Sequence, residues 1–313
     1  MIYEDNSAFS SKTITVTTTE ELTAAIRSLS WGDGGTVLVD GSAGPFTINA
    51  QNITRDGSPV LIKPLDPDEP PHVEQINILN ASHLTITGME IDSSRIAGTR
   101  PLWESDLNIR LSNDINIVGN KMESTADSYR DGINDVSVGA RGATVQEAEN
   151  ITFSQNTMTG YRDGFVYIEV VGLEIVGNDI SEFQGDALRG GGIQDVLIAE
   201  NHIHTPLGSV QTLNHTDFIQ IWGTDQTLLT KNVEIRDNVL DAAGGAGSQG
   251  IFIKNENVNE TGFYQNISIH NNVIHSSQPE GIGVQHVDGL EVYNNTLLWN
   301  KNATSQASPG ARE

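Results

Sequence analysis

Residues 115–122 read INIVGNKM, and their spacing, apolar-x-apolar-x-x-Asn-x-apolar, returns through most of the chain. The asparagines of the seven full copies are Asn120, Asn156, Asn178, Asn201, Asn238, Asn272 and Asn295. A degenerate copy around Leu84 has Met89 in the asparagine place. Successive asparagines are 36, 22, 23, 37, 34 and 23 residues apart. A base period of 22–23 residues with insertions indicates a solenoid.

The alternation of apolar residues predicts that each copy is a short strand with one face inward. The asparagine suits a tight bend, because it tolerates left-handed backbone and its amide bonds neighbouring backbone. Stacked in register ~4.8 Å apart, these asparagines would form a ladder along the axis. The sequence therefore predicts an all-β chain folded as a parallel β-helix.

A second phrase has an acidic or amide residue, usually followed by Gly, ahead of an apolar strand. Its copies begin at Asp131, Asp163, Asp186, Asp217, Gln249 and Glu280. The two phrases alternate in fixed order, so each coil contains one of each.

The solenoid predicts one domain over residues 13–300, with a flexible stretch 1–12 before it and a polar tail 301–313 after it. Thr18 or Thr19 can cap an amphipathic helix, within 18–30, that carries Glu20 and Glu21 in its first turn. Such a helix is expected to cover the open edge of the first coil. No C-terminal cap is visible, so the tail covers the last coil, or the natural protein continues or oligomerises there.

The insertions between strands are unevenly spread. They are predicted at 92–106, 121–130, 139–149, 204–216, 223–232, 241–248 and 255–265, while the coils over 150–203 are tight. A groove walled by loops is therefore expected in the later coils.

The charge and amino-acid composition exclude several classes of function. There are 17 basic and 41 acidic residues, a net charge of −24, and no basic stripe, which argues against nucleic acid. The charge favours solubility in salty surroundings. Cysteine is absent, no apolar run approaches 18 residues, and residues 1–17 lack the layout of a signal peptide. We expect no membrane insertion, and either secretion without a signal peptide or a place in a virion.

Alternation along the second phrase places a mixed row of side chains on the outer face. The row contains Asn134, Arg189, Gln220, Trp222, Phe252, Lys254 and Gln285, with His286 following it. Polar groups beside aromatic rings suit a sugar, which has hydroxyls at its edge and an apolar face. The alternative, that inserted loops cover Trp222 and Phe252, stays open.

The aspartates of the second phrase form a column at the bends. Asp163, Asp186 and Asp217 would lie ~5 Å from their neighbours, which suits a pair of glycosidase carboxylates. Stacked carboxylates also raise one another's pKa or hold Ca²⁺. The simpler interpretation is turn closure through backbone amides, which Gln249 and Glu280 favour by continuing the column.

The histidines allow one further hypothesis. His215, two residues before Asp217, is a candidate acid or base. His202 and His204 end the preceding coil, but no closely spaced pair of the His-x₃-His kind exists, so no metal site is predicted. Arg162, beside Asp163, is equally explained as part of a surface ion pair.

These features resemble the right-handed parallel β-helix (pectin-lyase-like) superfamily over roughly residues 13–300. The segments TEELTAAI (19–26) and GTVLV (35–39) are similar to the start of many of its polysaccharide lyases. The superfamily also includes polygalacturonases, C5-epimerases and phage tailspikes. The resemblance implies a right-handed helix and a polysaccharide lying across one sheet face, but fold alone does not fix the reaction.

The first hypothesis is cleavage of an acidic polysaccharide. We place β-elimination on a uronic-acid chain slightly ahead of hydrolysis. Elimination needs a group that neutralises the carboxylate, a base for the C5 proton and an acid for the leaving oxygen, and Arg189 or a bound cation, Lys254 and His215 are the candidates for these roles. For hydrolysis, Asp163, Asp186 and Asp217 would be acid and base. The alternatives are a C5-epimerase-like module and a glycan-binding tailspike, which would be a homotrimer. None of these functions points to a particular cofactor, and Ca²⁺ is the only cofactor that the sequence brings into consideration.

Overall fold

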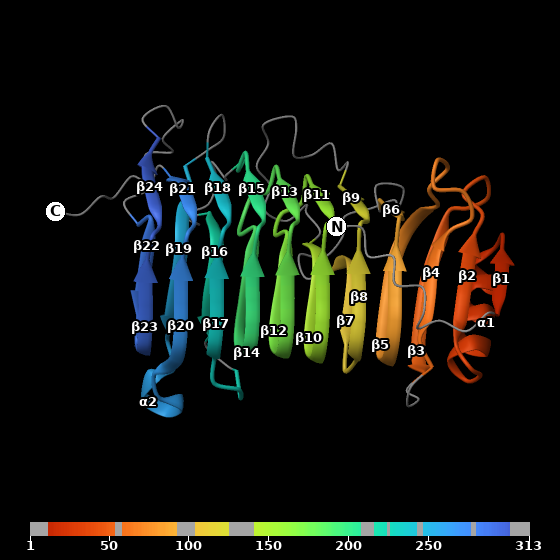
Figure 1. The fold of residues 1–313 in the computed structure, drawn as a ribbon, viewed down its shortest axis with the longest axis horizontal. Coiled ribbons are helices and arrows are strands. Elements are labelled where there is room, and N and C mark those ends of the chain that lie inside the picture. The colour runs from red at the N-terminus through yellow and green to blue at the C-terminus, as the bar shows by residue number, and fades with distance from the viewer. Residues whose placement is uncertain are drawn as a thin grey trace.

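The computed structural model describes residues 12–53, 58–92, 104–124, 141–207, 216–223, 226–242, 247–276 and 280–300. The chain winds as a parallel β-helix whose coils stack along one long axis (Figure 1). All strand pairs join neighbouring coils and are parallel. The predicted fold class is confirmed.

From β6 onward each coil contributes to three sheets, which are named here the first, second and third sheets. The first sheet contains β3 (Phe46–Ile53), β7 (Ser105–Arg110), β16 (Asp217–Gly223), β19 (Gln249–Asn255) and β22 (Ile282–Gln285). The second contains β1 (Thr13–Val16), β2 (Gly35–Val39), β4 (Val60–Pro64), β8 (Asn113–Val118), β17 (Lys231–Arg236), β20 (Tyr264–His270) and β23 (Val287–Tyr293).

Four long strands bend from the first sheet into the second, so that each belongs to both. They are β5 (His72–Thr87), β10 (Arg141–Ser154), β12 (Phe165–Val176) and β14 (Leu188–Ala199). The third sheet is made of short strands: β6 (Glu90–Ile91), β9 (Lys121–Glu123), β11 (Thr157–Thr159), β13 (Asp179–Ser181), β15 (His202–His204), β18 (Val239–Asp241), β21 (Val273–Ser276) and β24 (Thr296–Trp299).

The predicted asparagine ladder forms the corner between the second and third sheets. Asn178 shows the pattern: its Nδ2 donates to Asn201 Oδ1 at 2.9 Å and to the Phe153 carbonyl at 2.9 Å, and its backbone N–H donates to the same Asn201 oxygen at 3.0 Å. The pattern runs from Asn120 to Asn295. Where Met89 replaces asparagine, only its backbone N–H joins, donating to Asn120 Oδ1 at 3.0 Å.

The corner between the first and second sheets has a second, exposed ladder. Asn232 donates to Asp195 at 2.8 Å and accepts from Asn266 at 3.0 Å. These three residues have left-handed backbone, with φ of 55°, 57° and 53°, which Asn and Asp tolerate better than most residues.

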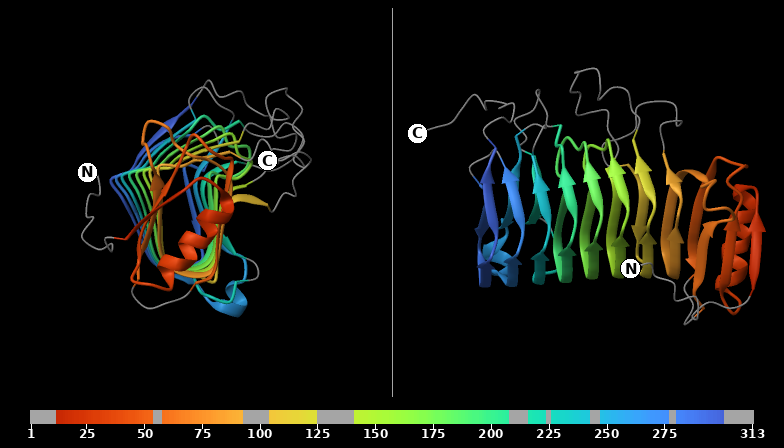
Figure 2. Two further views of the ribbon diagram at one scale, coloured as in Figure 1. Left: turned by 90° about the vertical axis from the view of Figure 1, so that its right-hand side faces the viewer. Right: turned by 45° about the horizontal axis from the view of Figure 1, so that its top comes forward.

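The core is a narrow column of inward apolar side chains, such as Ile175, Ile198 and Ile235, all fully buried. The predicted cap is α1 (Thr19–Ser30), which begins where Thr18 Oγ1 accepts from the Glu21 N–H at 3.2 Å. It lies across the open end of the first coils (Figure 2). A second, short helix, α2 (Val258–Thr261), falls in the predicted 255–265 insertion.

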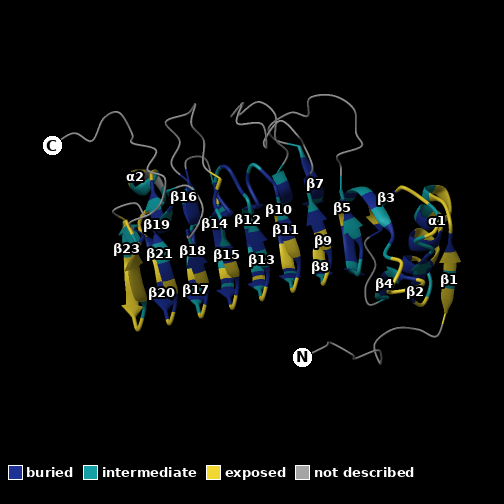
Figure 3. Ribbon diagram, turned by 90° about the horizontal axis from the view of Figure 1, so that it is seen from above, coloured by how far each residue is buried: buried dark blue, intermediate teal, exposed yellow. Residues whose placement is uncertain are grey.

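The last described coil lies open at the other end of the stack. Its apolar side chains, including Leu290, Leu297 and Trp299, are 41%, 56% and 58% exposed, and β23 is coloured as exposed in Figure 3. Residues 1–12, apart from Lys12, and the tail 301–313 lie outside the described residues, so the predictions for them stay predictions.

Some predicted boundaries are wrong. Residues 141–149 do not form an insertion, because β10 begins at Arg141 and is in register with β12, and residues 121–123 form β9. Gly142 follows Arg141 as Gly164 follows Asp163, so the coil ahead of Asp163 has an arginine in the aspartate place. The predicted Asp131 copy and Asn134 lie outside the described residues.

We predict that Asn178→Ala lowers the free energy of unfolding by ~1–3 kcal/mol, because it removes buried hydrogen bonds to two neighbouring coils. The measurement is denaturant unfolding. The matched control is Asn232→Gly in the exposed ladder, where glycine keeps the positive φ and water replaces the lost partner. Equal losses in the two variants would show that the buried ladder contributes no more than the solvated one.

Candidate active site

The first sheet brings most of the predicted row together in one hollow. Strand register aligns Arg189, Gln220 and Phe252 across β14, β16 and β19, and aligns Trp222 with Lys254. The hollow, of about 550 Å³, is lined by Arg162, Asp163, Gly185, Asp186, Arg189, Gln220, Trp222, Phe252, Lys254 and Glu256. Seven of the predicted site residues thus meet in one place.

The aspartate column lies along the floor of this hollow. The Asp186 N–H donates to Asp163 Oδ1 at 3.4 Å, and the Asp217 N–H donates to Asp186 Oδ1 at 3.1 Å. One oxygen of these carboxylates therefore closes the turn of the next coil, as the simpler interpretation expected. The other oxygen, Oδ2, is left to face other side chains.

Two partly buried arginines face the Oδ2 atom of Asp163. Arg141 Nε lies 3.6 Å away and Arg162 Nη1 lies 3.7 Å away, while the Asp163 side chain is only 2% exposed. Burial lowers the pKa of Arg141 and the charge of Asp163 opposes that shift. The interpretation of Arg162 as half of a surface ion pair is therefore wrong: the pair is largely desolvated.

Asp186 is in a different electrostatic state. Burial, followed by the charges of Asp217 and Asp163, raises its pKa to about 8, and Arg189, whose Nη1 lies 3.9 Å from Asp186 Oδ2, opposes the shift only in part. At neutral pH this side chain is therefore mostly a protonated acid at the floor of the hollow.

Asp217 lies beneath the hollow rather than on its surface. It is fully buried, and its Oδ2 accepts from Gln220 Nε2 at 2.7 Å. Gln220, predicted to face a sugar, thus turns toward the column and is 8% exposed. The two side chains hold each other in place below Arg189.

Trp222 forms the wall of the hollow. It is half-buried, the Arg189 guanidinium lies 5.5 Å from its ring centroid, and its Nε1 donates to Glu256 Oε1 at 3.4 Å. Glu256 also pairs with Lys254 at 2.8 Å, and the hydrogen bond from Lys254 is the main cause that lowers the pKa of Glu256. The indole is therefore positioned at the rim of the hollow with a face toward Arg189.

Three other candidates do not line the hollow. Gln285 is exposed one coil beyond Lys254. His286 has a φ of 60°, and its Nδ1 lies 2.8 Å from the Asn255 carbonyl oxygen, so it belongs to the corner of the coil. His215 lies outside the described residues.

Two residues of the site escaped the sequence reasoning. Glu256 follows Lys254 by two positions, so the same alternation extended by one step would have found it. Arg141 gave no such signal, because the Asp131 phrase imitates the start of that coil.

The charge of the hollow is opposite in sign to that of the chain. With Asp186 protonated, the lining carries three cations (Arg162, Arg189 and Lys254) against two carboxylates (Asp163 and Glu256). Because guanidinium groups already face Asp163 and Asp186, this column is a poor fit for Ca²⁺, which prefers several free oxygen ligands. The arrangement instead provides a proton donor, an ionised carboxylate and cations for an anionic ligand.

A larger hollow, of about 700 Å³, runs along the corner between the first and second sheets. Its polar side chains include Asp195, Asn232 and Asn266, which bond to one another in the exposed ladder. We infer that this hollow has a structural role, because its polar side chains hydrogen-bond to one another between successive coils.

Comparison with solved structures places this geometry in a known architecture. The chain is similar to an alginate lyase from Paenibacillus sp. (13% identity, 93% of this chain and 99% of that chain, TM-score 0.55). It is similar to the Streptococcus pneumoniae surface adhesin PfbA (13%, 94% and 98%, 0.58) and to the Dettilon tailspike protein (14%, 92% and 52%, 0.57). No protein-family model and no curated protein sequence matches it.

The chain therefore has a parallel β-helix fold, which it shares with this alginate lyase, this adhesin and this tailspike protein. Enzymes, adhesins and tailspikes share this fold, and the similarity extends to the fold alone. Among the described residues, no helix is long and apolar enough to cross a bilayer.

The raised pKa of Asp186 predicts a pH-dependent stability. The pKa of Asp186 is about 8 in the folded state and an ordinary 3.8 in the unfolded state, so the folded state loses stability as pH rises through this window. Asp186→Asn removes that loss. We expect the variant to gain a few kcal/mol relative to the wild type between about pH 5 and pH 8.5, measured by denaturant unfolding at both values.

The matched control is Asp163→Asn, which leaves Arg141 and Arg162 without their buried counter-charge. It should lower stability at both pH values. If the stability difference between Asp186→Asn and the wild type is the same at both pH values, Asp186 is ionised in the folded state and cannot be the proton donor of the site.

Proposed function

We propose that the chain hydrolyses an acidic polysaccharide, with Asp186 as the general acid. The observation that carries this proposal is the buried Asp186, whose pKa is raised to about 8 by burial and like charges, in a hollow that also contains Trp222 and three cationic side chains. A general acid must hold its proton at working pH, and burial beside like charges is the ordinary means of achieving that.

In the reaction, water adds across the bond between an anomeric carbon and the bridging oxygen. Asp186 gives its proton to the bridging oxygen, the hydroxyl of water joins the anomeric carbon, and Asp163 takes the remaining proton. Proton exchange with solvent then restores both groups. Asp163 is assigned this part because Arg141 Nε and Arg162 Nη1, 3.6 Å and 3.7 Å from its Oδ2, hold the carboxylate in place beside Asp186.

Binding is assigned to the wall and the cations. A sugar ring would lie against Trp222, whose indole offers an apolar surface. Arg162 and Arg189 would pair with the carboxylates of a uronic acid or the sulfates of a sulfated sugar. Gln220 then acts as a positioning residue for Asp217 rather than as a direct sugar contact.

β-Elimination has less support from the same groove. It needs a base that can reach a C5 proton, but the Lys254 amine is already paired with Glu256 at 2.8 Å. A binding-only protein is the second candidate, because similar folds include a surface adhesin and a tailspike. Either function places the protein outside the cell or on a virion, and a tailspike role would call for a homotrimer.

The test is a panel of acidic and neutral polysaccharides, read by new reducing ends and by ultraviolet absorbance. Hydrolysis gives reducing ends without absorbance. Asp186→Asn should lower kcat by ~10²–10⁴, because the amide cannot donate the proton. Asp195→Asn, in the exposed ladder on another face, is the matched control and should turn over as the wild type does.

Products that absorb ultraviolet light would show that the reaction is β-elimination rather than hydrolysis. No products of either kind, together with measurable glycan binding, would favour the adhesin or tailspike interpretation. If Asp186→Asn kept full activity, the proton donor would be another group.

A separate prediction concerns Trp222. In an Asp186→Asn background, which binds without turnover, Trp222→Ala should weaken oligosaccharide binding by ~1–3 kcal/mol, measured by calorimetry. The melting temperature should change little, because the ring is half-buried at the rim. Trp299→Ala, another exposed tryptophan at the far end of the stack, should leave affinity unchanged. Unfolding of the Trp222→Ala variant would instead make the ring a core residue.

A further inference from the structure

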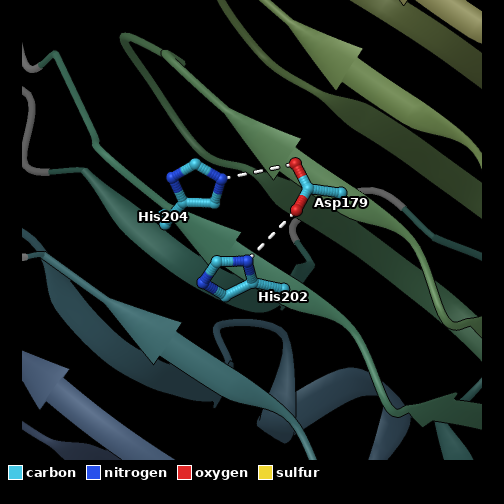
Figure 4. Close-up of side chains that lie close together, drawn as sticks. All are labelled: Asp179, His202 and His204. Atoms are coloured by element: carbon cyan, nitrogen blue, oxygen red, sulfur yellow. Dashed lines mark hydrogen bonds and ion pairs between the residues drawn. The ribbon is translucent and has the colours of Figure 1, made fainter.

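Two histidines and an aspartate meet on the third sheet, on strands that contribute nothing to the groove. His202 and His204 lie at both ends of β15 and flank the fully buried Ile203, so both point outward. Asp179, at the start of β13 in the preceding coil, is in register with His202. Figure 4 shows both imidazoles turned toward the Asp179 carboxylate.

The contacts arrange the three side chains around one point. His202 Nδ1 lies 3.1 Å from Asp179 Oδ2, and His204 Nε2 lies 3.3 Å from Asp179 Oδ1. The two rings stack with centroids 4.3 Å apart, and Thr205 Oγ1 lies 2.9 Å from the second nitrogen of His204, Nδ1. One candidate ligand atom from each residue lies within 4.8 Å of the other two.

These separations suit a metal ion. Zinc binds imidazole nitrogen and carboxylate oxygen at ~2.0–2.2 Å, so neighbouring ligand atoms in tetrahedral or octahedral geometry lie about 3.0–3.5 Å apart. The observed 3.1 Å and 3.3 Å fall in that range. Two imidazoles and one carboxylate are a ligand set of borderline softness, which selects transition metals over Ca²⁺ or Mg²⁺.

We propose that Asp179, His202 and His204 bind one transition-metal ion, Zn²⁺ in the first place, on the outer face of the third sheet. The ligands come from two consecutive coils, so the bound ion would link them across the stack. Thr205 would fix the ring of His204 through its second nitrogen, the kind of support that ligating histidines normally have.

Strand geometry explains why the sequence did not predict this site. Histidine pairs that share a metal on a helix are three or four positions apart, whereas on a strand the equivalent spacing is two. The third ligand comes from a different coil, 23 residues upstream of His202, and only register brings it near.

Calorimetric titration of the full chain with ZnCl₂, in buffer with excess Mg²⁺, tests the proposal. We expect one Zn²⁺ per chain, and at least about tenfold weaker binding for His202→Ala and for His204→Ala. Co²⁺ should report nitrogen ligation through visible absorption that both variants lose. Zn²⁺ should also raise the melting temperature of the wild type and not of the variants.

The matched control is His83→Asn. His83 faces a single carboxylate, Asp114, at 3.4 Å with comparable exposure, and its φ of 58° is one that asparagine tolerates. This variant should bind Zn²⁺ as the wild type does. Absence of Zn²⁺ binding, or equal binding by the His202 and His204 variants, would overturn the proposal and leave the cluster as a set of hydrogen bonds.

Discussion

The amide of each ladder asparagine is the contact on which the rest of the molecule depends. In Asn178, Oδ1 accepts two hydrogen bonds from Asn156 of the preceding coil, while Nδ2 donates to a carbonyl of that coil and to Asn201 Oδ1 of the next coil. Because these groups are buried, an offset of one residue would leave several of them unsatisfied. The amide therefore fixes the register of each coil on the next.

Fixed register determines what can meet on the outer faces. A side chain on one strand lies ~4.8 Å from its counterpart in the next coil, so residues far apart in sequence become neighbours without any loop to hold them. Arg189, Gln220 and Phe252 are aligned in this way, and so are Asp179 and His202. The groove and the histidine cluster are therefore both formed by the register of strands in successive coils.

Much of the fold could be predicted from the sequence, because it is repetitive and local. The ladder, α1 and the row from Arg189 to Lys254 all follow from alternation and spacing. Arg141 was missed, since the Asp131 phrase ten residues earlier imitates the repeat and only tertiary pairing decides between the two.

The ionisation of the aspartates in the site was harder to predict from the sequence. That stacked carboxylates raise one another's pKa was foreseeable, but not which aspartate would hold the proton. Asp163 has two guanidinium neighbours and Asp186 has one, at a longer distance, and that difference comes from side-chain positions. Similarly, the turn of Gln220 toward Asp217 depends on burial that no local pattern encodes.

The two oxygens of a carboxylate in the aspartate column have different contacts, and this determines how the scaffold can change. One carboxyl oxygen of Asp163 and of Asp186 accepts a backbone N–H of the next coil, and the side-chain oxygen of asparagine is an equivalent acceptor. Exchange of acid for amide can therefore alter the chemistry of one coil while the architecture persists. In such a solenoid the distinction between a catalyst and a lectin is confined to a few atoms on its outer face.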